Sequence, residues 1–229
     1  VVQDGTVYAV EGTNQTSAFD VSDGTRRWSY PGAILCDPPK RYGNTLYVEK
    51  DTDSGGTALV VLDASTGESR WQYQAGKTAG DGFNVTGAIE HDRTVYATEY
   101  GGLLVALQSA DRTEQWQYPT TNDTRDPPIV ANDTVYVPVG DTTVHAVDRV
   151  TGEYVWSHSF ERSLREIQAT SDAVVCWTHG DDAAGVHARS FDGDPMWSVI
   201  IQGTTTPPTV TDSGAYIGTR SGYVVKLGD

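Results

Sequence analysis

The sequence has little of what marks membrane-spanning, helical or metal-binding proteins. No apolar run approaches the ~18 residues of a membrane-spanning helix, and no signal peptide is visible. No segment repeats apolar residues at i, i+3 and i+4, and Gly or Pro interrupts the chain every few residues. Only two cysteines occur, Cys36 and Cys176, which says little about the redox compartment. We therefore expect an all-β chain without a membrane span.

Lysine is also scarce, whereas acidic residues are abundant. The chain has 4 Lys and 12 Arg against 22 Asp and 9 Glu, with a formal net charge of −15. An Asp-rich, Lys-poor surface stays hydrated in strong salt, so we interpret the source as a halophile. An ordinary acidic secreted protein is the alternative. Nucleic acids and anionic membranes are poor partners for so negative a protein.

Tryptophan, by contrast, recurs at an almost fixed interval. Five tryptophans are separated by 43, 45, 40 and 41 residues, and each follows an apolar–polar segment by eight residues. The tryptophans are Trp28, Trp71, Trp116, Trp156 and Trp197, and the segments end at Asp20, Asp63, Gln108, Asp148 and Arg189. A period of about 40 residues with strand-like content predicts a β-propeller, with one four-stranded blade per repeat.

Six repeat units can be aligned on a second feature, a pair of strand-forming residues that follows a polar turn. The pairs are Val7-Tyr8, Leu46-Tyr47, Val95-Tyr96, Val135-Tyr136, Val175-Cys176 and Ala215-Tyr216. Pro pairs at 38–39, 127–128 and 207–208 mark where the first strand of a unit enters. The order within a unit is then first strand, VY strand, ALD strand and Trp strand. A turn glycine precedes the Trp strand, except in the third unit, which has Arg112.

Two insertions near the second unit interrupt this rhythm. The hairpin EKDTDSGG (49–56) is four residues longer than its counterparts, and QAGKTAGDGFNVTG (74–87) lengthens the passage to the third unit. Loops that outgrow a repeat often carry partner contacts. Neutral insertions without a function are the equally compatible alternative.

The repeats predict one propeller domain over residues 1–229, with incomplete first and last units. VVQDGTVYA (1–9) aligns with IVANDTVYV (129–137), so the chain begins inside a repeat, and the last unit stops after its third strand. We prefer a parent protein of seven or eight blades, with a closed six-bladed ring as the alternative. The two cysteines lie three units apart, too far for a disulfide, and are expected to be free buried thiols.

The combination PPxV…DGTVYV…ALDxxTGExxW resembles the repeat of the pyrroloquinoline-quinone-type (PQQ) propeller family. Residues 126–156 match it best, and the resemblance spans the whole chain. It implies that the five periodic tryptophans dock between adjacent blades. Trp177 lies outside this register and is interpreted as local packing.

The family includes quinoprotein alcohol and sugar dehydrogenases, an outer-membrane assembly lipoprotein and cell-surface proteins without known chemistry. Resemblance to the dehydrogenases would imply an adjacent Cys-Cys pair, a calcium held by Glu, Asn and Asp, and a catalytic Asp. This chain has no Cys-Cys pair, and no such ligand set can be matched. We therefore predict no catalytic residue and no cofactor.

Weak site candidates lie ten residues before the second member of each aligned pair. These positions hold Asp37, Thr86, Asp126, Glu166 and Thr206, with Arg125 and Arg165 one residue earlier in two units. If the first strands line a channel, the carboxylates at its mouth could hold a cation or polar ligand. The alternative, which we favour, is a water-filled lining with local Arg–carboxylate pairs.

Other candidate sites fail on spacing. EKDTDSGG superficially looks like a calcium loop, but position 12 counted from Asp51 is Leu62 where an EF-hand needs Glu. The five histidines show no metal-binding spacing, and His145 and His187 occupy corresponding places, which favours strand packing. No nucleophile elbow or P-loop is present. We predict no metal site.

The leading hypothesis is a non-catalytic binding or assembly scaffold, exported to the surface of a halophile, whose partner is another protein or a small polar ligand. Four N-glycosylation sequons, at Asn14, Asn84, Asn122 and Asn132, favour an extracellular location if the host glycosylates. A quinone-dependent dehydrogenase or its remnant is the alternative. A third possibility is the sensor domain of a larger signalling protein.

Overall fold

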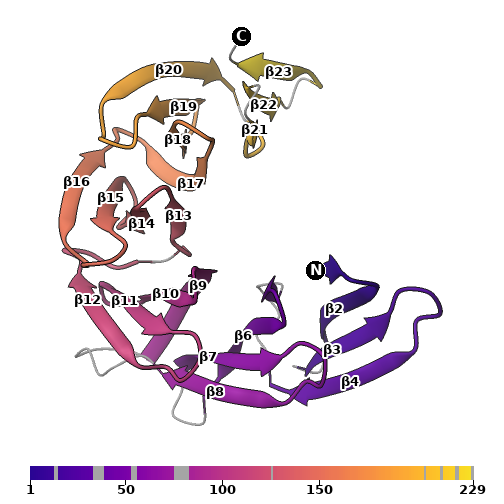
Figure 1. The fold of residues 1–229 in the computed structure, drawn as a ribbon. Helices are drawn as coiled ribbons and strands as arrows, with labels where there is room; N and C mark the ends of the chain where they lie inside the picture. The colour runs from indigo at the N-terminus through magenta and orange to yellow at the C-terminus, as the bar shows by residue number, and fades with distance from the viewer. Residues whose placement is uncertain are drawn as a thin grey trace. The chain divides into compact units, whose positions relative to one another are not determined.

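A computed structural model describes residues 1–12, 15–32, 39–52, 56–74, 83–124, 126–203, 205–211, 214–219 and 222–227. Every helix or strand that it assigns there is a β-strand (Figure 1), which confirms the all-β prediction. The chain divides into two compact units, residues 1–117 and 118–229, and each is described by itself. Within the described residues, no helix is long and apolar enough to cross a membrane.

The first unit contains three blades. The first blade is a four-stranded antiparallel sheet of β1 (Val2–Gln3), β2 (Thr6–Glu11), β3 (Gln15–Asp20) and β4 (Arg26–Pro31). The second consists of β5 (Lys40–Tyr42), β6 (Thr45–Asp51), β7 (Gly56–Asp63) and β8 (Ser69–Gln74), and the third of β9 (Phe83–His91), β10 (Thr94–Glu99), β11 (Leu103–Gln108) and β12 (Glu114–Pro119). These last two blades join into one eight-stranded sheet.

The second unit also contains three blades. One is built from β13 (Ile129–Ala131), β14 (Thr134–Val139), β15 (Thr143–Asp148) and β16 (Tyr154–Ser159), and the next from β17 (Ser163–Ala169), β18 (Val174–His179), β19 (Ala183–Arg189) and β20 (Pro195–Gln202). The last is the three-stranded sheet of β21 (Thr209–Thr211), β22 (Gly214–Gly218) and β23 (Val224–Leu227). Strands follow one another in sequence order within each blade, as predicted.

The two insertions meet each other where the structure describes them. β7 and β9 pair in parallel through Gly56 with Phe83 and Thr57 with Asn84, and the Thr57 hydroxyl donates to the Val85 carbonyl at 2.8 Å. The longer hairpin and the longer connection therefore extend two strands that join the second and third blades. Residues 53–55 and 75–82, the rest of the insertions, lie outside the described residues.

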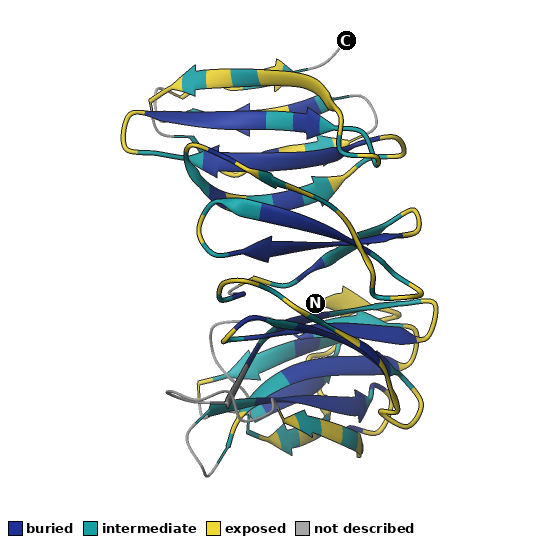
Figure 2. Cartoon of the chain, turned by 90° about the vertical axis from the view of Figure 1, so that its left-hand side faces the viewer, coloured by how far each residue is buried: buried dark blue, intermediate teal, exposed yellow. Residues whose placement is uncertain are grey.

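The core lies in the second and third strands of the blades. All six residues of β10 and of β14 are buried, whereas the fourth strands β4, β8 and β16 alternate between exposed and half-buried residues (Figure 2). Strands covered on both faces by neighbouring sheets carry continuous apolar runs, and strands covered on one face alternate. This explains why the VY and ALD segments are the most apolar parts of each repeat.

Three of the periodic tryptophans connect neighbouring sheets through their indole nitrogens. Trp28 Nε1 donates to the Ala64 carbonyl at 3.0 Å, Trp71 Nε1 to Ser109 at 2.8 Å and Trp156 Nε1 to Phe191 at 2.8 Å. In each case the acceptor lies in the turn after the third strand of the next blade. The buried polar end of the indole is thereby satisfied while its ring packs on apolar residues.

The glycine in that turn gives the tryptophan room. Gly193 has φ +91°, and a Cβ there would lie 2.8 Å from the indole ring of Trp156. A side chain would therefore be strained and would collide with the docked ring. In the third unit Arg112 adopts φ +67° without glycine, and its guanidinium donates to the Gln72 carbonyl at 2.7 Å beside Trp71.

The remaining tryptophans differ in burial. Trp116 is 9% exposed and packs against Tyr96 with ring centroids 5.7 Å apart. Trp197 on β20 is 37% exposed. Trp177, outside the periodic set, lies in β18 in a cluster with Val186 of the neighbouring strand and Ile217 of the next blade, so its packing extends beyond its own blade.

The docking contact predicts unequal effects of two tryptophan substitutions. Trp156→Ala removes a ring packed between two sheets and its hydrogen bond, so we expect the free energy of unfolding to fall by about 3 kcal/mol. Trp197→Ala, at the corresponding place on a more exposed strand, should lower it by less than about 1 kcal/mol. Guanidinium denaturation followed by circular dichroism measures both. Equal losses would contradict the docking role of Trp156.

Candidate functional site

The predicted channel-mouth residues are only partly described. Asp37 and Arg125 lie outside the described residues, and Asp126 is exposed three residues before β13 begins. Glu166 is half-buried on β17, and the exposed Arg165 stands at a bulge between Leu164 and Glu166. An ion or polar ligand at these positions stays a prediction.

Glu166 has a partner of its own within the second unit. Its Oε1 accepts a hydrogen bond of 2.7 Å from the Gln168 amide, which also donates to the Pro208 carbonyl at 2.7 Å. Gln168 Oε1 in turn accepts from the Val210 backbone at 3.0 Å. Through Gln168, this carboxylate takes part in the joint between β17 and β21. Among the described residues, no group of three His, Cys, Asp or Glu could hold a metal ion.

A more distinctive arrangement appears where the fourth strand of one blade packs on the next blade. The residue two positions after the periodic tryptophan is, in the five successive units, Tyr30, Tyr73, Tyr118, His158 and Val199. Tyr30 packs on the cluster that contains Val60 and Leu62, and Tyr73 packs on the one that contains Val105 and Leu107. Two joints therefore pack tyrosine over Val and Leu.

Strand pairing corrects the sequence alignment of the fifth unit by one residue. Arg189 pairs with Val174, as Val147 pairs with Val135 and Leu62 with Leu46. The Ser190 amide closes its turn on Asp194, four residues on, whereas Asp148 closes on Glu153, five residues on. The turn is one residue shorter, so Arg189 takes an apolar position and Ser190 the position of the repeat's Asp.

This correction has two further consequences for the alignment. Val174-Val175, and not Val175-Cys176, occupies the place of Val135-Tyr136. Counted back from these pairs, Arg165 and not Glu166 corresponds to Asp126. His187 pairs with Ser198 as His145 pairs with Ser157, which confirms that the two histidines occupy corresponding places.

All three usual apolar positions are therefore changed between β16 and β19. His158 replaces tyrosine, His187 stands where other units have Val60 or Val105, and Arg189 stands where they have Leu62 or Leu107. The preceding joint is intermediate, because the Tyr118 hydroxyl contacts His145 Nδ1 at 2.9 Å above Val147. We call the set His158, Phe160, Arg162, Thr178, His187 and Arg189 the basic groove.

The side chains of the basic groove contact one another directly. The Arg189 guanidinium donates to His158 Nε2 at 2.7 Å and to the Gly193 carbonyl at 2.6 Å, and its buried Nε has no hydrogen-bond partner among the described residues. His187 Nε2 and the Thr178 hydroxyl lie 3.1 Å apart. The Phe160 ring lies between the two imidazoles, 4.7 Å from His158 and 4.9 Å from His187. Because a guanidinium only donates, His158 is neutral with its proton on Nδ1.

Burial and positive charge keep both histidines neutral. Burial lowers the pKa of His158, and Arg189 lowers it further. Burial likewise lowers the pKa of His187, assisted by His158, Arg189 and Arg162. Burial also lowers the pKa of Arg189. At neutral pH the formal positive charge of the groove therefore resides on the two arginines.

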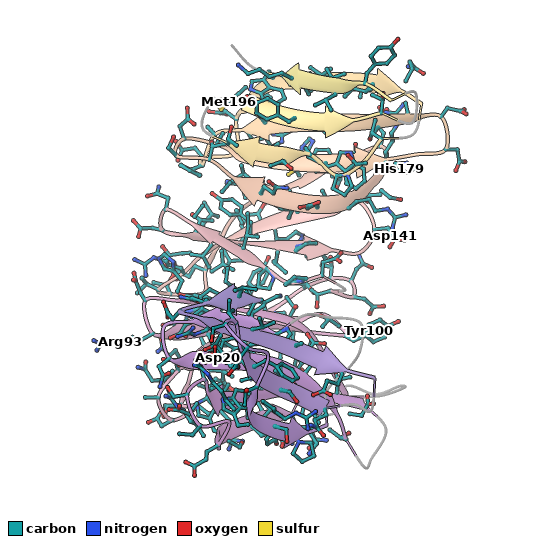
Figure 3. The ribbon with its side chains drawn as sticks, turned by 90° about the vertical axis from the view of Figure 1, so that its right-hand side faces the viewer. Asp20, Arg93, Tyr100, Asp141, His179 and Met196 are labelled. Carbon is teal, nitrogen blue, oxygen red and sulfur yellow. The ribbon has the colours of Figure 1, made fainter. Side chains whose placement is uncertain are left out.

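Two cavities open beside these residues. The first, of about 350 Å³, is lined by His158, Ser159, Phe160, Glu161, Arg162, Thr178, His187 and Ile200. The second, of about 320 Å³, is lined by His158, His187, Ala188, Arg189, Pro195, Met196, Trp197 and Ser198. Both cavities are lined by residues of the blade formed by β17 to β20, and Figure 3 labels Met196 and His179 at opposite ends of this blade. An imidazole is shorter than a phenol, which leaves space that tyrosine fills in the other joints.

Sequence reasoning interpreted His187 as strand packing and gave no role to His158 or Arg189. One signal was available, since His158 breaks a run of tyrosines two residues after the docking tryptophan. Cys176, next to this region, is a free buried thiol, as predicted, and burial raises its pKa to about 12, so it is unreactive. Cys36 lies outside the described residues.

Comparisons with known proteins point to one family. The sequence profile of the family described as outer membrane protein assembly factor BamB matches residues 1–137, 56–206 and 140–228. BamB from Moraxella catarrhalis is similar in structure, with a TM-score of 0.76 and 20% identity over 97% of this chain and 69% of that chain. No curated protein sequence matches the chain.

Other solved structures share the fold at lower identity. A europium-containing methanol dehydrogenase has a TM-score of 0.57 and 16% identity over 81% of this chain and 49% of that one. The quinohemoprotein alcohol dehydrogenase ADHIIG from Pseudomonas putida HK5 has a TM-score of 0.70 and 12% identity over 100% of this chain and 56% of that one. A chain of the mitotic checkpoint complex has a TM-score of 0.72 and 10% identity over 98% of this chain and 72% of that one. These likenesses confirm the β-propeller fold and show the fold alone.

The basic groove predicts a coupled histidine titration. His158 and His187 should titrate below the ordinary histidine pKa of 6.5, and Arg189→Leu should raise the pKa of His158 because it removes the adjacent positive charge. Because the pKa values of the two histidines are lower in the folded wild-type chain than in the unfolded chain, the unfolded chain binds more protons as the pH drops below about 6.5. The free energy of unfolding of the wild type should therefore fall over this range. Nuclear magnetic resonance of the imidazole protons measures the titrations. Arg26→Leu, remote in sequence and exposed, is the control, and unchanged midpoints in Arg189→Leu would refute the coupling.

Proposed function

Because the chain belongs to the family of the outer membrane protein assembly factor BamB, we propose that it is a non-catalytic scaffold that binds other proteins. The observation that carries this proposal is the family match itself, which runs in overlapping segments from residue 1 to residue 228. The chain spans 69% of the similar BamB chain. A role in assembling outer-surface proteins is part of the proposal.

The likeness to quinoprotein dehydrogenases supports catalysis less well. This chain spans 49% and 56% of the two dehydrogenase chains, at 16% and 12% identity. Its two cysteines, Cys36 and Cys176, are far from adjacent in sequence. A propeller alone does not imply an activity, because chemistry depends on the residues of a site.

Exposed apolar side chains favour the second unit as the partner-binding part. Among the described residues, most of the large exposed apolar side chains belong to it. They are Val150, Tyr154, Val155, Met196, Trp197, Ile200, Tyr216, Tyr223 and Val224. Apolar surface of this kind is a common feature of protein–protein contacts. The described ends of the two insertions, by contrast, take part in strand pairing within the first unit.

The proposal includes an exported protein of a halophile. The net charge of −15 and the excess of Asp over Lys support a high-salt environment, and the four sequons support an extracellular location. A protein partner is compatible with this charge, whereas nucleic acid is not.

Assays for quinone chemistry separate the scaffold from the dehydrogenase. We expect no dye-linked oxidation of methanol, ethanol or glucose after the chain is mixed with pyrroloquinoline quinone and Ca²⁺. A quinoprotein dehydrogenase from any source provides the positive control. Saturable quinone binding accompanied by turnover would replace our proposal with the enzymatic one.

Partner binding predicts different effects for two matched valines. The partner is first captured from envelope extracts and identified by mass spectrometry. Val155→Ser on β16 should then lower the affinity for this partner about tenfold, because it removes apolar contact area. Val21→Ser alters a similarly exposed valine of the first unit and should leave affinity unchanged. Biolayer interferometry with the purified partner gives both affinities. Equal affinities for wild type and Val155→Ser would remove β16 from the proposed contact surface.

The proposed halophilic origin predicts that salt strongly stabilises the folded protein. Because repulsion among the excess carboxylates is screened by salt, we expect the Tm to rise by on the order of 10 °C between 0.2 and 3 M KCl. Differential scanning fluorimetry measures the shift. A Tm that does not rise over this range would contradict the halophilic assignment.

A further inference from the structure

We propose that the basic groove between β16 and β19 is a binding site for a carboxylate group. The groove is the one described joint in which a histidine replaces the tyrosine after the docking tryptophan and an arginine replaces the Leu or Val beneath it. Burying polar groups in an apolar joint is unfavourable unless they gain partners. A bound anion would supply that compensation.

The two arginines of the groove form no close ion pair with a carboxylate among the described residues, although Asp194 interacts with Arg189 electrostatically. In this acidic chain, five described arginines form ion pairs with carboxylates: Arg26, Arg27, Arg41, Arg70 and Arg149. Neither Arg162 nor Arg189 has a carboxylate oxygen within ion-pair distance among the described residues, although both belong to the groove. Arg189 instead donates to a neutral imidazole and a backbone carbonyl. Its charge is therefore only partly compensated.

The groove is shaped around its polar side chains. Gly185 lies under His187, and a Cβ there would lie 2.5 Å from His187 Nε2 and 2.6 Å from the Thr178 hydroxyl. Glycine at this position thus permits the close contact between the imidazole and the hydroxyl. Phe160 holds both imidazoles by ring contacts. The polar groups are consequently ordered before a ligand arrives, which limits the entropy lost on binding.

Charge and shape favour a carboxylate over a phosphate. Among the residues that line the two cavities, Arg162 and Arg189 contribute two positive charges and Glu161 contributes one negative charge, whereas Asp192 and Asp194 in the following turn line neither cavity. With both histidines neutral, the formal balance of +1 matches a monoanionic carboxylate better than a dianionic phosphate. The exposed Met196 and Ile200 beside the two cavities can contact an aliphatic chain attached to the carboxylate. Cavities of this size accept a small molecule or one side chain.

Carboxylate binding should be coupled to protonation of the histidines. A negative ligand stabilises the charged imidazolium forms, so affinity should rise as the pH falls from 7.5 to 5.5. The titratable and charged groups around the imidazoles come from four segments: Glu161 and Arg162 after β16, Cys176 on β18, Arg189 on β19, and Asp192 and Asp194 in the following turn. Because histidine is the residue type that ordinarily changes its charge between pH 5 and 8, we expect the two histidines to dominate the change.

The carboxylate could come from a free organic acid or from an acidic side chain or C-terminus of a protein partner. The test uses the full chain, ¹⁵N-labelled at histidine, titrated with hexanoate, with inorganic phosphate and with a short peptide that ends in Leu-Glu. We expect saturable shifts of the His158 and His187 signals with hexanoate or the peptide, and affinity about threefold higher at pH 5.5 than at 7.5. Tighter binding of hexanoate would indicate a free organic acid as the source of the carboxylate, and tighter binding of the peptide would indicate a protein partner.

The repeat itself provides the loss-of-function variant. His158→Tyr, His187→Val and Arg189→Leu together restore the packing of the other joints, so the variant should fold with equal or greater stability. It should bind hexanoate at least about tenfold more weakly, because the charge-assisted hydrogen bonds are lost. Arg26→Leu removes the same number of arginine charges from the first unit and should bind as wild type. Arg189→Gln, a polar and uncharged replacement, repeats the test if the triple variant does not fold.

Several results would overturn the proposal. They are the absence of saturable histidine shifts with any carboxylate, tighter binding of phosphate than of hexanoate and peptide, and equal affinity in wild type and the Arg189 variants. The scaffold proposal would survive each of them, because it is tested separately by the quinone assay and the valine variants.

Discussion

The packing of each sheet against the next is the constraint on which this protein depends. Strands β10 and β14 are buried along their whole length, so a single blade in water would expose its own core. Trp28, Trp71 and Trp156 join fourth strands to turns of the following blades and satisfy backbone carbonyls there. The glycine beneath Trp156 and the period of about 40 residues both follow from this contact.

The same constraint limits where the repeat can carry a function. Two joints of the first unit use tyrosine over Val and Leu, which provides apolar contact between the sheets. Between β16 and β19, His158, His187 and Arg189 replace that packing and leave two cavities. Trp156, two residues before His158, still donates to the Phe191 carbonyl. The joint therefore keeps its tryptophan contact, although polar side chains replace the apolar ones beside it.

The comparisons separate architecture from activity. An assembly factor, two dehydrogenases and a chain of the mitotic checkpoint complex share this fold at 10 to 20% identity. Sheet stacking can therefore be maintained by many sequences, whereas an activity depends on a few side chains. Family membership favours binding, and the carboxylate site that we propose in the basic groove would give that binding a specific chemistry.

The sequence alone determined the strand order, the six blades and the tryptophan spacing, because alternation and turn residues are local signals. Only the tertiary structure decided that β7 pairs with β9 and that Arg189 occupies an apolar position, since a one-residue deletion in a turn barely alters the pattern of apolar residues. The cavities beside His158 were equally invisible, because they result from the space between side chains about 30 residues apart in sequence.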